Sequence, residues 1–217
     1  MIDRKLVSPW AATTERARTR SSKREAVLRT AAQVFNEKGY LASTLDEVAD
    51  RLNVTKPTLY YYVKSKDDIL YECVHIGLTM LQDAVKLVGA SGGSAVDKLV
   101  AAMRKYTEIV TMDFGMCVIR VGEDPLPPAS QRKLRRIKAG IDREFRELIQ
   151  LGIKEGSIRP CDPKMAAFVL GGALSWIGRW YRPGGSWSPD DIADQAIALL
   201  ANGLCSGKFK VSPQQLR

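Results

Sequence analysis

Three consecutive tyrosines stand between lysines in the stretch VTKPTLYYYVKSKDDIL, which covers residues 54–70. A phenol can donate a hydrogen bond to a phosphate oxygen while its ring packs against a sugar or a thymine methyl group. Lysine side chains supply the positive charge that attracts a polyanion. This combination of residue types therefore indicates binding of nucleic acid.

Catalytic chemistry has few candidate residues in this chain. The sequence holds one histidine, His75, and four cysteines, at positions 73, 117, 161 and 205. Neither a nucleophile paired with a base nor a cluster of zinc ligands can be assembled from them. We therefore expect no enzyme activity, no metal and no catalytic cofactor. The dispersed thiols are expected to be small core residues in a reducing compartment.

Positive charge is concentrated in the first third of the chain. The protein has 217 residues and a formal net charge of +9. Residues 1–66 carry 13 basic and 7 acidic side chains, whereas residues 67–217 carry 20 and 17. An anionic partner is therefore expected to bind in the first third. Because no apolar leader is present and the longest nearly apolar run, residues 166–178, is too short to span a bilayer, we expect a cytoplasmic protein without membrane contact.

Helix-capping residues divide residues 23–70 into short helices. An apolar period ends at Gly39, and Thr44 opens a T-x-x-E capping box. Asn53 stands where a left-handed residue is wanted, and Thr55 can cap the next helix. Two helices of about eight residues each are too short to be stable alone, so they must pack together. A helix-turn-helix is the expected solution.

The second short helix has one buried and one exposed side. At about 100° per residue, Leu59 and Val63 define the buried side, and Tyr61 points away from it. Tyr60 and Tyr62 project to the two flanks. Packing of the tyrosines against neighbouring helices is the alternative, and some packing by Tyr60 is expected in either case. The outer surface comprises Lys56, Pro57, Thr58 and Tyr61.

The remaining chain has helical periodicity throughout and no strand alternation. Apolar residues recur at helical spacing between breaks rich in glycine and proline, such as residues 122–128. We expect an all-α protein of about nine helices, with an N-terminal helix-turn-helix three-helix domain and a larger C-terminal helical domain.

The segment TLDEVADRLNVTKPTLYYYVKSKDDIL resembles the DNA-binding signature of the TetR/AcrR family of bacterial transcriptional regulators. The likeness is close over residues 23–70, and the helix order extends it to the whole chain. Two positions depart from the pattern, since Asn53 replaces the usual glycine and Tyr62 the commoner histidine. The resemblance implies a sequence-specific regulator that binds a palindromic double-stranded operator as a homodimer and is released by a small-molecule effector. Repression is the default, and activation stays open.

The resemblance also implies a domain plan and DNA contacts. A flexible basic arm is expected over residues 1–22, a DNA-binding domain over 23–68, and a ligand-binding and dimerisation domain over 69–217. Helix geometry ranks Tyr61 above Tyr60 as the outward residue, so either could contact bases. Phosphate contacts are implied for Thr44, Thr55, Tyr61, Tyr62 and Lys66, base-edge contacts for Lys56, Pro57, Thr58 and Tyr60, and minor-groove contacts for Arg16, Arg18 and Arg20.

The later helices are expected to hold the effector. A stacking surface beside guanidinium groups suits a flat anionic molecule. The segment over 175–185 is similar to that of family members that sense acyl-CoA thioesters, and the basic stretch 131–143 could hold phosphates or be a solvated face. An uncharged hydrophobic effector is the alternative. For the first six candidate effector residues, plain core packing is the commoner role of such side chains. The candidates are Met103, Tyr106, Val110, Phe114, Met116, Val118, Trp176, Arg179, Trp180 and Arg182.

The last two long helices are the expected dimer interface, because small residues let helices approach closely; packing within one chain is the alternative. Effector binding is expected to tilt the helix that starts near Lys66 and so change the spacing of the two recognition helices. An architectural DNA-binding protein without effector is the remaining alternative. The interface candidates are Gly172, Ala173, Trp176, Ile192, Ala196, Leu199, Leu200 and Gly203.

Overall fold

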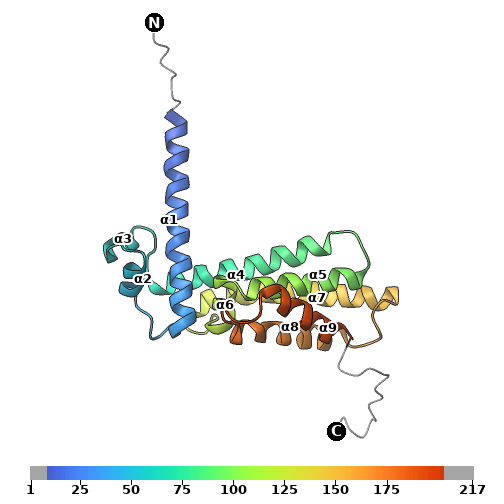
Figure 1. The fold of residues 1–217 in the computed structure, drawn as a ribbon. Helices are drawn as coiled ribbons and strands as arrows, with labels where there is room; N and C mark the ends of the chain where they lie inside the picture. The colour runs from blue at the N-terminus through green and yellow to red at the C-terminus, as the bar shows by residue number, and fades with distance from the viewer. Residues whose placement is uncertain (1–8, 203–217) are drawn as a thin grey trace. The chain divides into compact units, whose positions relative to one another are not determined.

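The computed structural model describes residues 9–202, with side chains from Arg20 onward, and every regular element in that range is a helix (Figure 1). The all-α prediction is therefore confirmed for the described residues. The helices are α1 (Pro9–Lys38), α2 (Leu45–Arg51), α3 (Lys56–Tyr60), α4 (Lys66–Gly89), α5 (Ala95–Val110), α6 (Asp113–Arg120), α7 (Pro128–Glu155), α8 (Pro163–Trp180) and α9 (Pro189–Asn202).

Helix α1 begins earlier than the sequence pattern predicts. Its backbone is helical over 30 residues from Pro9, so residues 9–22 belong to this helix and not to a flexible arm. The segment is rich in alanine and arginine, which are strong helix formers, and this composition explains why the helix continues. The side chains of Arg16 and Arg18 lie outside the described part of the chain.

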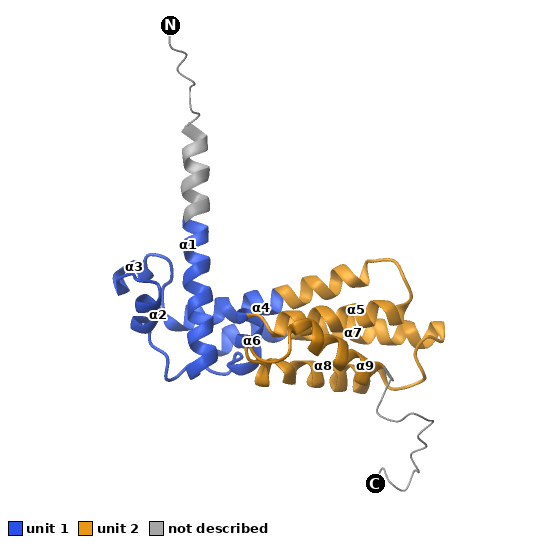
Figure 2. Ribbon diagram, viewed as in Figure 1, with its two compact units in different colours: residues 1–79, 113–136 blue, residues 80–112, 137–217 orange. Residues whose placement is uncertain are grey.

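The chain divides into two compact units (Figure 2). Unit 1 contains residues 1–79 and 113–136, and unit 2 contains residues 80–112 and 137–217. The boundary expected at residue 68 differs from this division, because α4 and α7 contribute to both units and α6 belongs to unit 1. Helix α6 packs on α1, where Asp113 accepts hydrogen bonds from Gln33 Nε2 (3.0 Å) and Asn36 Nδ2 (2.8 Å).

Unit 1 has a small apolar core below α2 and α3. Leu28, Phe35, Val48, Leu59 and Ile69, which come from all four of its first helices, are each at most 1% exposed. Neither α2 nor α3 is long enough to be stable in isolation, so this shared core holds them in place. Ion pairs at the surface add to the connection between α1 and α2.

Unit 2 is a bundle in which α5 packs against α8 and α9. Ser94 and Asp97 form a capping box at the start of α5. The hydroxyl groups of Tyr106 and Ser175 share a hydrogen bond of 2.8 Å between α5 and α8. Arg104 of α5 forms an ion pair with Asp194 of α9.

The cysteines occupy different environments. Cys73 and Cys117 are buried, and burial raises the pKa of the Cys117 thiol to about 12. Cys161 is exposed in the connection between α7 and α8, so the prediction that the thiols are core residues is wrong for this position. Cys205 lies outside the described residues.

Among residues 9–202, no helix is long and apolar enough to cross a membrane. Within the same range, no three or more His, Cys, Asp or Glu side chains are grouped so that they could hold a metal ion.

Candidate nucleic-acid interface

Helices α2 and α3 form the helix-turn-helix that the capping residues predict. Thr44 caps α2, since its hydroxyl accepts a hydrogen bond from the Glu47 N–H at 3.2 Å. The Glu47 carboxylate pairs with Lys38 and Arg51, and this ties the start of α2 to the end of α1. Asn53 has a φ of 52°, the left-handed conformation expected for it in the turn.

Helix α3 is shorter than expected, with five residues in place of about eight. Thr55 is its N-cap residue, but its hydroxyl does not cap the backbone and bonds to the Thr58 hydroxyl at 2.9 Å. Leu59 is fully buried and Val63 is 3% exposed. The two anchors predicted from their spacing are therefore both buried, Leu59 within α3 and Val63 just beyond its end.

The outward face of α3 is open to solvent. Lys56, Pro57 and Thr58 are exposed. Tyr61 is 65% exposed and Tyr60 is 49% exposed, an order that agrees with the helix geometry. Packing alone does not explain two such exposed phenols.

The ring of Tyr61 contacts two side chains, those of Tyr62 and Arg20. The half-buried ring of Tyr62 meets it edge-on with 5.1 Å between centroids. The guanidinium carbon of Arg20, from α1, lies 5.1 Å from the Tyr61 ring centroid. The sequence pattern placed Arg20 in a flexible arm. In the structure it is a helical residue whose guanidinium group lies over a tyrosine ring. The contact puts a positive charge beside the phenol.

Lys56 carries an acidic neighbour that sequence reasoning missed. Its ammonium nitrogen lies 2.8 Å from Asp46 Oδ2, and this hydrogen bond raises the pKa of Lys56. The pair joins α2 to α3 across the turn. Asp46 carries no distinguishing signal in the sequence, because acidic residues are ordinary in the first turn of a helix.

A second group that the sequence pattern did not mark surrounds Lys66 at the start of α4. The Lys66 ammonium nitrogen lies 4.3 Å from the centroid of the Tyr40 ring. The Tyr40 hydroxyl donates a hydrogen bond to Asp67 Oδ1. Burial lowers the pKa of Lys66. Tyr40 directly follows the glycine that ends α1, a position where periodicity gives no role to a side chain.

The first six effector candidates are divided between the two units. Met103 and Val110 are buried in unit 2, and Phe114, Met116 and Val118 are buried in unit 1. Tyr106 is half-buried and bonded to Ser175. The structure gives each of these residues a place in the core, and their assignment to an effector stays a prediction.

The aromatic and basic cluster near the end of α8 lies at the surface. Trp176 is 64% exposed and Trp180 is 41% exposed, and Arg179 and Arg182 are exposed as well. Trp187, which the sequence pattern did not single out, meets Trp180 edge-on at 6.3 Å. These side chains therefore form an open aromatic surface rather than an enclosed cavity wall.

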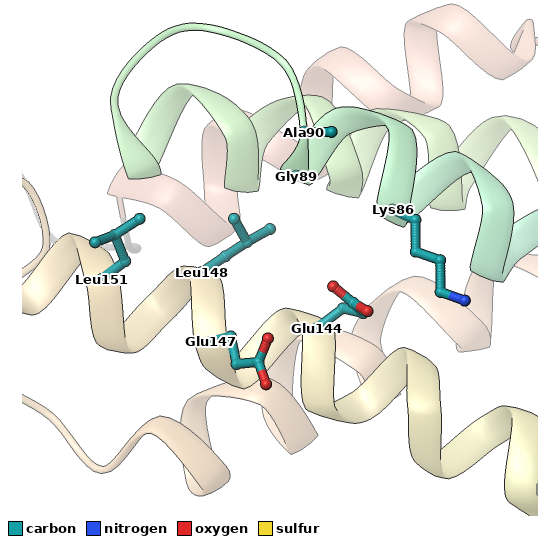
Figure 3. Close-up of a pocket in the computed structure, with 7 residues that line it drawn as sticks. All are labelled: Lys86, Gly89, Ala90, Glu144, Glu147, Leu148 and Leu151. Carbon is teal, nitrogen blue, oxygen red and sulfur yellow. The ribbon is translucent and has the colours of Figure 1, made fainter.

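A pocket of about 280 Å³ lies between α4 and α7 within unit 2 (Figure 3). None of the predicted effector residues lines it. Its lining residues are Lys86, Gly89, Ala90, Glu144, Glu147, Leu148 and Leu151.

Apolar side chains are exposed along one face of α8. Gly172, Ala173 and Trp176 lie on this face, and Met165, Phe168 and Val169 extend it toward the start of the helix. On α9, Leu199 is exposed and Ala196 and Leu200 are half-buried. Ile192 is buried in unit 2 at 5% exposure, and its assignment to a dimer interface stays a prediction. Gly203 lies outside the described residues.

Comparison with known proteins defines the class. Residues 27–73 match the family described as "Bacterial regulatory proteins, tetR family", and residues 92–204 match "Tetracyclin repressor-like, C-terminal domain". The chain belongs to the TetR family. It is a DNA-binding transcriptional regulator rather than an enzyme.

Three relatives illustrate the likeness. The HTH-type transcriptional repressor KstR2 of Rhodococcus jostii (strain RHA1) is 28% identical over 192 residues, which is 86% of this chain and 93% of KstR2. The TetR family regulator PfmR from Thermus thermophilus is 26% identical with a TM-score of 0.75, over 82% of this chain and 98% of PfmR. AibR, solved with isovaleryl coenzyme A and operator DNA, shares the fold at 24% identity and a TM-score of 0.72, over 81% of this chain and 96% of AibR.

Proposed function

We propose that this protein is a transcriptional repressor that binds a palindromic operator as a homodimer and leaves it when an acyl-CoA thioester binds. The observation that carries DNA recognition is the surface of α3, where Lys56, Tyr60 and Tyr61 face solvent above the buried Leu59 and Val63. Because bacterial DNA lies in the cytoplasm, the protein acts there.

The DNA contacts divide into two groups. Thr44, Thr55, Tyr61, Tyr62 and Lys66 contact phosphates and fix the position of the module on the duplex. Lys56, Pro57, Thr58 and Tyr60 contact base edges in the major groove. The exposure of α3 supports the second group, since all four base-reading candidates are exposed residues within this helix.

Dimerisation supplies the second helix-turn-helix, which contacts the second half-site of the operator. One helix-turn-helix contacts a single half-site, and two copies reach consecutive major grooves. The exposed apolar face of α8, with Phe168 at 53%, Val169 at 57% and Trp176 at 64% exposure, is the surface that a second copy covers. Leaving so much apolar surface in water would favour aggregation.

The effector surface is built from Trp180, Trp187, Arg179 and Arg182. Indole rings offer stacking surfaces for an adenine base, and guanidinium groups pair with phosphates. The AibR complex supports the idea, because it shows that a protein of this fold can bind an acyl-CoA thioester and an operator.

Release depends on α4. This helix starts at Lys66 in unit 1 and continues into unit 2, so one helix has residues in both. An effector that binds unit 2 better in one position of α4 shifts the population toward that position. Displacing the start of α4 alters the spacing of the two recognition helices, and they no longer fit grooves about one helical turn apart.

Footprinting of the region upstream of the protein's own gene tests the proposal. We expect protection of a palindrome of about 15–30 base pairs, with half-sites about one turn apart. Isovaleryl-CoA and longer acyl-CoA esters should remove the protection, whereas free CoA and an uncharged fatty-acid methyl ester should leave it.

The outcomes separate the parts of the proposal. The absence of a protected palindrome would contradict sequence-specific repression. If a palindrome is protected but acyl-CoA esters at large excess neither release DNA nor raise the unfolding temperature, the acyl-CoA assignment is wrong. Release by the uncharged compound alone would favour a hydrophobic effector, for which the buried Met103 and Val110 supply an apolar surrounding.

A further inference from the structure

The ammonium group of Lys66 is held by an aromatic ring. Its nitrogen lies 4.3 Å from the centroid of the Tyr40 ring, and the side chain is half-buried at the first residue of α4. A lysine side chain otherwise has four rotatable bonds and little preference among its rotamers. The ring therefore restricts where the charge can lie before any DNA arrives.

This type of contact leaves the donors of the ammonium available. A cation–π attraction acts through the ring quadrupole and does not need an acceptor atom. An ammonium group has three N–H donors and no acceptor. Lys66 held over Tyr40 can thus direct its N–H groups at a phosphate oxygen, which it could not do if a carboxylate occupied them.

The same tyrosine restrains the neighbouring acid. Its hydroxyl donates a hydrogen bond to Asp67 Oδ1, and Asp67 is the residue directly after Lys66. A carboxylate at the start of α4 repels DNA phosphates and attracts Lys66. The hydrogen bond holds this carboxylate at the Tyr40 hydroxyl, where its charge partly offsets the effect of burial on the pKa of Lys66.

Tyr40 is itself fixed in place. Its ring meets the ring of Phe35 edge-on with 5.5 Å between centroids, and Phe35 is 1% exposed. The residue before it, Gly39, has a φ of 78° and turns the chain sharply at the end of α1. The tyrosine therefore stands on the core of unit 1 and reaches from the end of α1 to the start of α4.

We propose that Tyr40 is a positioning residue for DNA binding, which holds Lys66 toward a backbone phosphate with its ring and keeps Asp67 aside with its hydroxyl. The inference rests on the proposed function, since it needs Lys66 to contact operator DNA. Tyr40 touches no DNA itself. Its role is to orient the ammonium group of Lys66 before DNA binds.

A double-mutant cycle on Tyr40 and Lys66 tests the role of the ring. Operator affinity is measured over a range of salt concentrations for wild type, Tyr40→Leu, Lys66→Gln and the double variant. Lys66→Gln should lower the slope of log K against log salt by about one unit. Because leucine removes the hydroxyl as well as the ring, Tyr40→Leu should weaken binding about threefold with lysine at position 66, and only about twofold, through the release of Asp67, once Lys66 is glutamine.

A second cycle separates the effect of the Tyr40 hydroxyl from that of its ring. It also keeps the inference testable if Tyr40→Leu does not fold. Tyr40→Phe keeps the ring and should retain the wild-type salt slope. It should weaken operator binding about twofold, because Asp67 is released beside the phosphates. This loss should vanish when Tyr40→Phe is combined with Asp67→Asn.

The two hypotheses fail in different ways. If wild-type protein binds no operator, the proposed function is wrong. If it binds but Lys66→Gln leaves affinity and salt slope unchanged, Lys66 contacts no phosphate and the inference falls. The inference is also overturned if Tyr40→Leu weakens binding by the same factor with lysine and with glutamine at position 66, or if the Tyr40→Phe loss persists with asparagine at position 67.

Discussion

Tyr60 and Tyr61 are adjacent phenols with different surroundings. The guanidinium group of Arg20 lies over the Tyr61 ring, and a positive charge at that point favours a DNA phosphate beside it. Tyr60 is the last residue of α3 and is exposed, on the same short helix as Lys56. We therefore propose that Tyr61 contacts the phosphate backbone and that Tyr60 contacts the bases.

Alanine substitutions distinguish these roles. Tyr61→Ala should weaken binding to operator and to unrelated duplex by the same factor, about tenfold, because a hydrogen bond to a charged group is lost. Fluorescence anisotropy titrations with both duplexes at one salt concentration measure the two affinities. Tyr60→Ala is the matched control and should reduce operator affinity alone. An altered preference in the Tyr61 variant would reverse the assignment.

Asp46 places a negative charge on the surface that we propose faces DNA. Asp46→Asn should increase operator affinity about threefold at low salt, since one repulsive charge disappears and Lys56 is released from its ion pair. The unfolding temperature should not change, because both partners of the pair are exposed. Asp194→Asn breaks the pair with Arg104 in unit 2 and should leave DNA affinity unaltered. Weaker binding by the Asp46 variant would show that the pair orients Lys56 for contact.

At the scale of elements, the crossing of α4 and α6 depends on Gly77. A Cβ atom at this position would lie 2.6 Å from the Phe114 carbonyl oxygen and 2.7 Å from Val118 Cγ2. The first of these neighbours is backbone and cannot turn aside. The absence of a side chain thus lets two helices of unit 1 approach closely.

Gly77→Ala should lower the free energy of unfolding by about 1–3 kcal/mol, as other overpacking substitutions do. Urea denaturation followed by circular dichroism gives this value. Gly140→Ala in α7 is the control: the added Cβ would meet only the end of the Gln82 side chain, at 2.7 Å, and that chain can move. The free energy of unfolding of the Gly140→Ala variant should equal that of wild type or exceed it by up to about 1 kcal/mol, since alanine favours a helix. Equal effects of the two substitutions would refute the argument.

Periodicity and capping signals predict the elements well and their limits less well. Leu59 and Val63 were identifiable as anchors because helical spacing places them on one side. The early start of α1 could not be identified, because arginines at alternate positions are compatible with both a flexible arm and a helix. Helix α3 ends at Tyr60, where the chain turns toward Val63. Capping residues mark where a helix begins, and they did not predict this early end.

Contacts between elements far apart in sequence explain the other misses. Asp113 joins α6 to α1 through Gln33 and Asn36, which are 80 and 77 residues away. Tyr40 and Lys66 likewise meet only after the chain has folded. Such pairings decide which helices form a unit and which side chains complete a site, and one sequence contains no signal for them.

At the scale of the whole molecule, the exposed face of α8 determines the oligomeric state that we propose. Trp176→Glu should produce a monomer and reduce operator affinity at least tenfold, because a charge buried between two copies is strongly unfavourable. Sedimentation velocity measures the state directly. Leu87→Glu changes another exposed apolar residue, at 75% exposure on α4, and should leave a dimer. A dimeric Trp176 variant would place the interface elsewhere.

The short recognition helix has a consequence for how this protein can diverge. Leu59 and Val63 provide its attachment, and Asn53 provides the turn before it. Lys56, Thr58 and Tyr60 face outward and add little to the core. Evolution can therefore exchange the outward residues, and with them the set of regulated genes, while the fold stays intact. The same independence would let an engineer transplant a new operator preference into this scaffold by changing only its outer face.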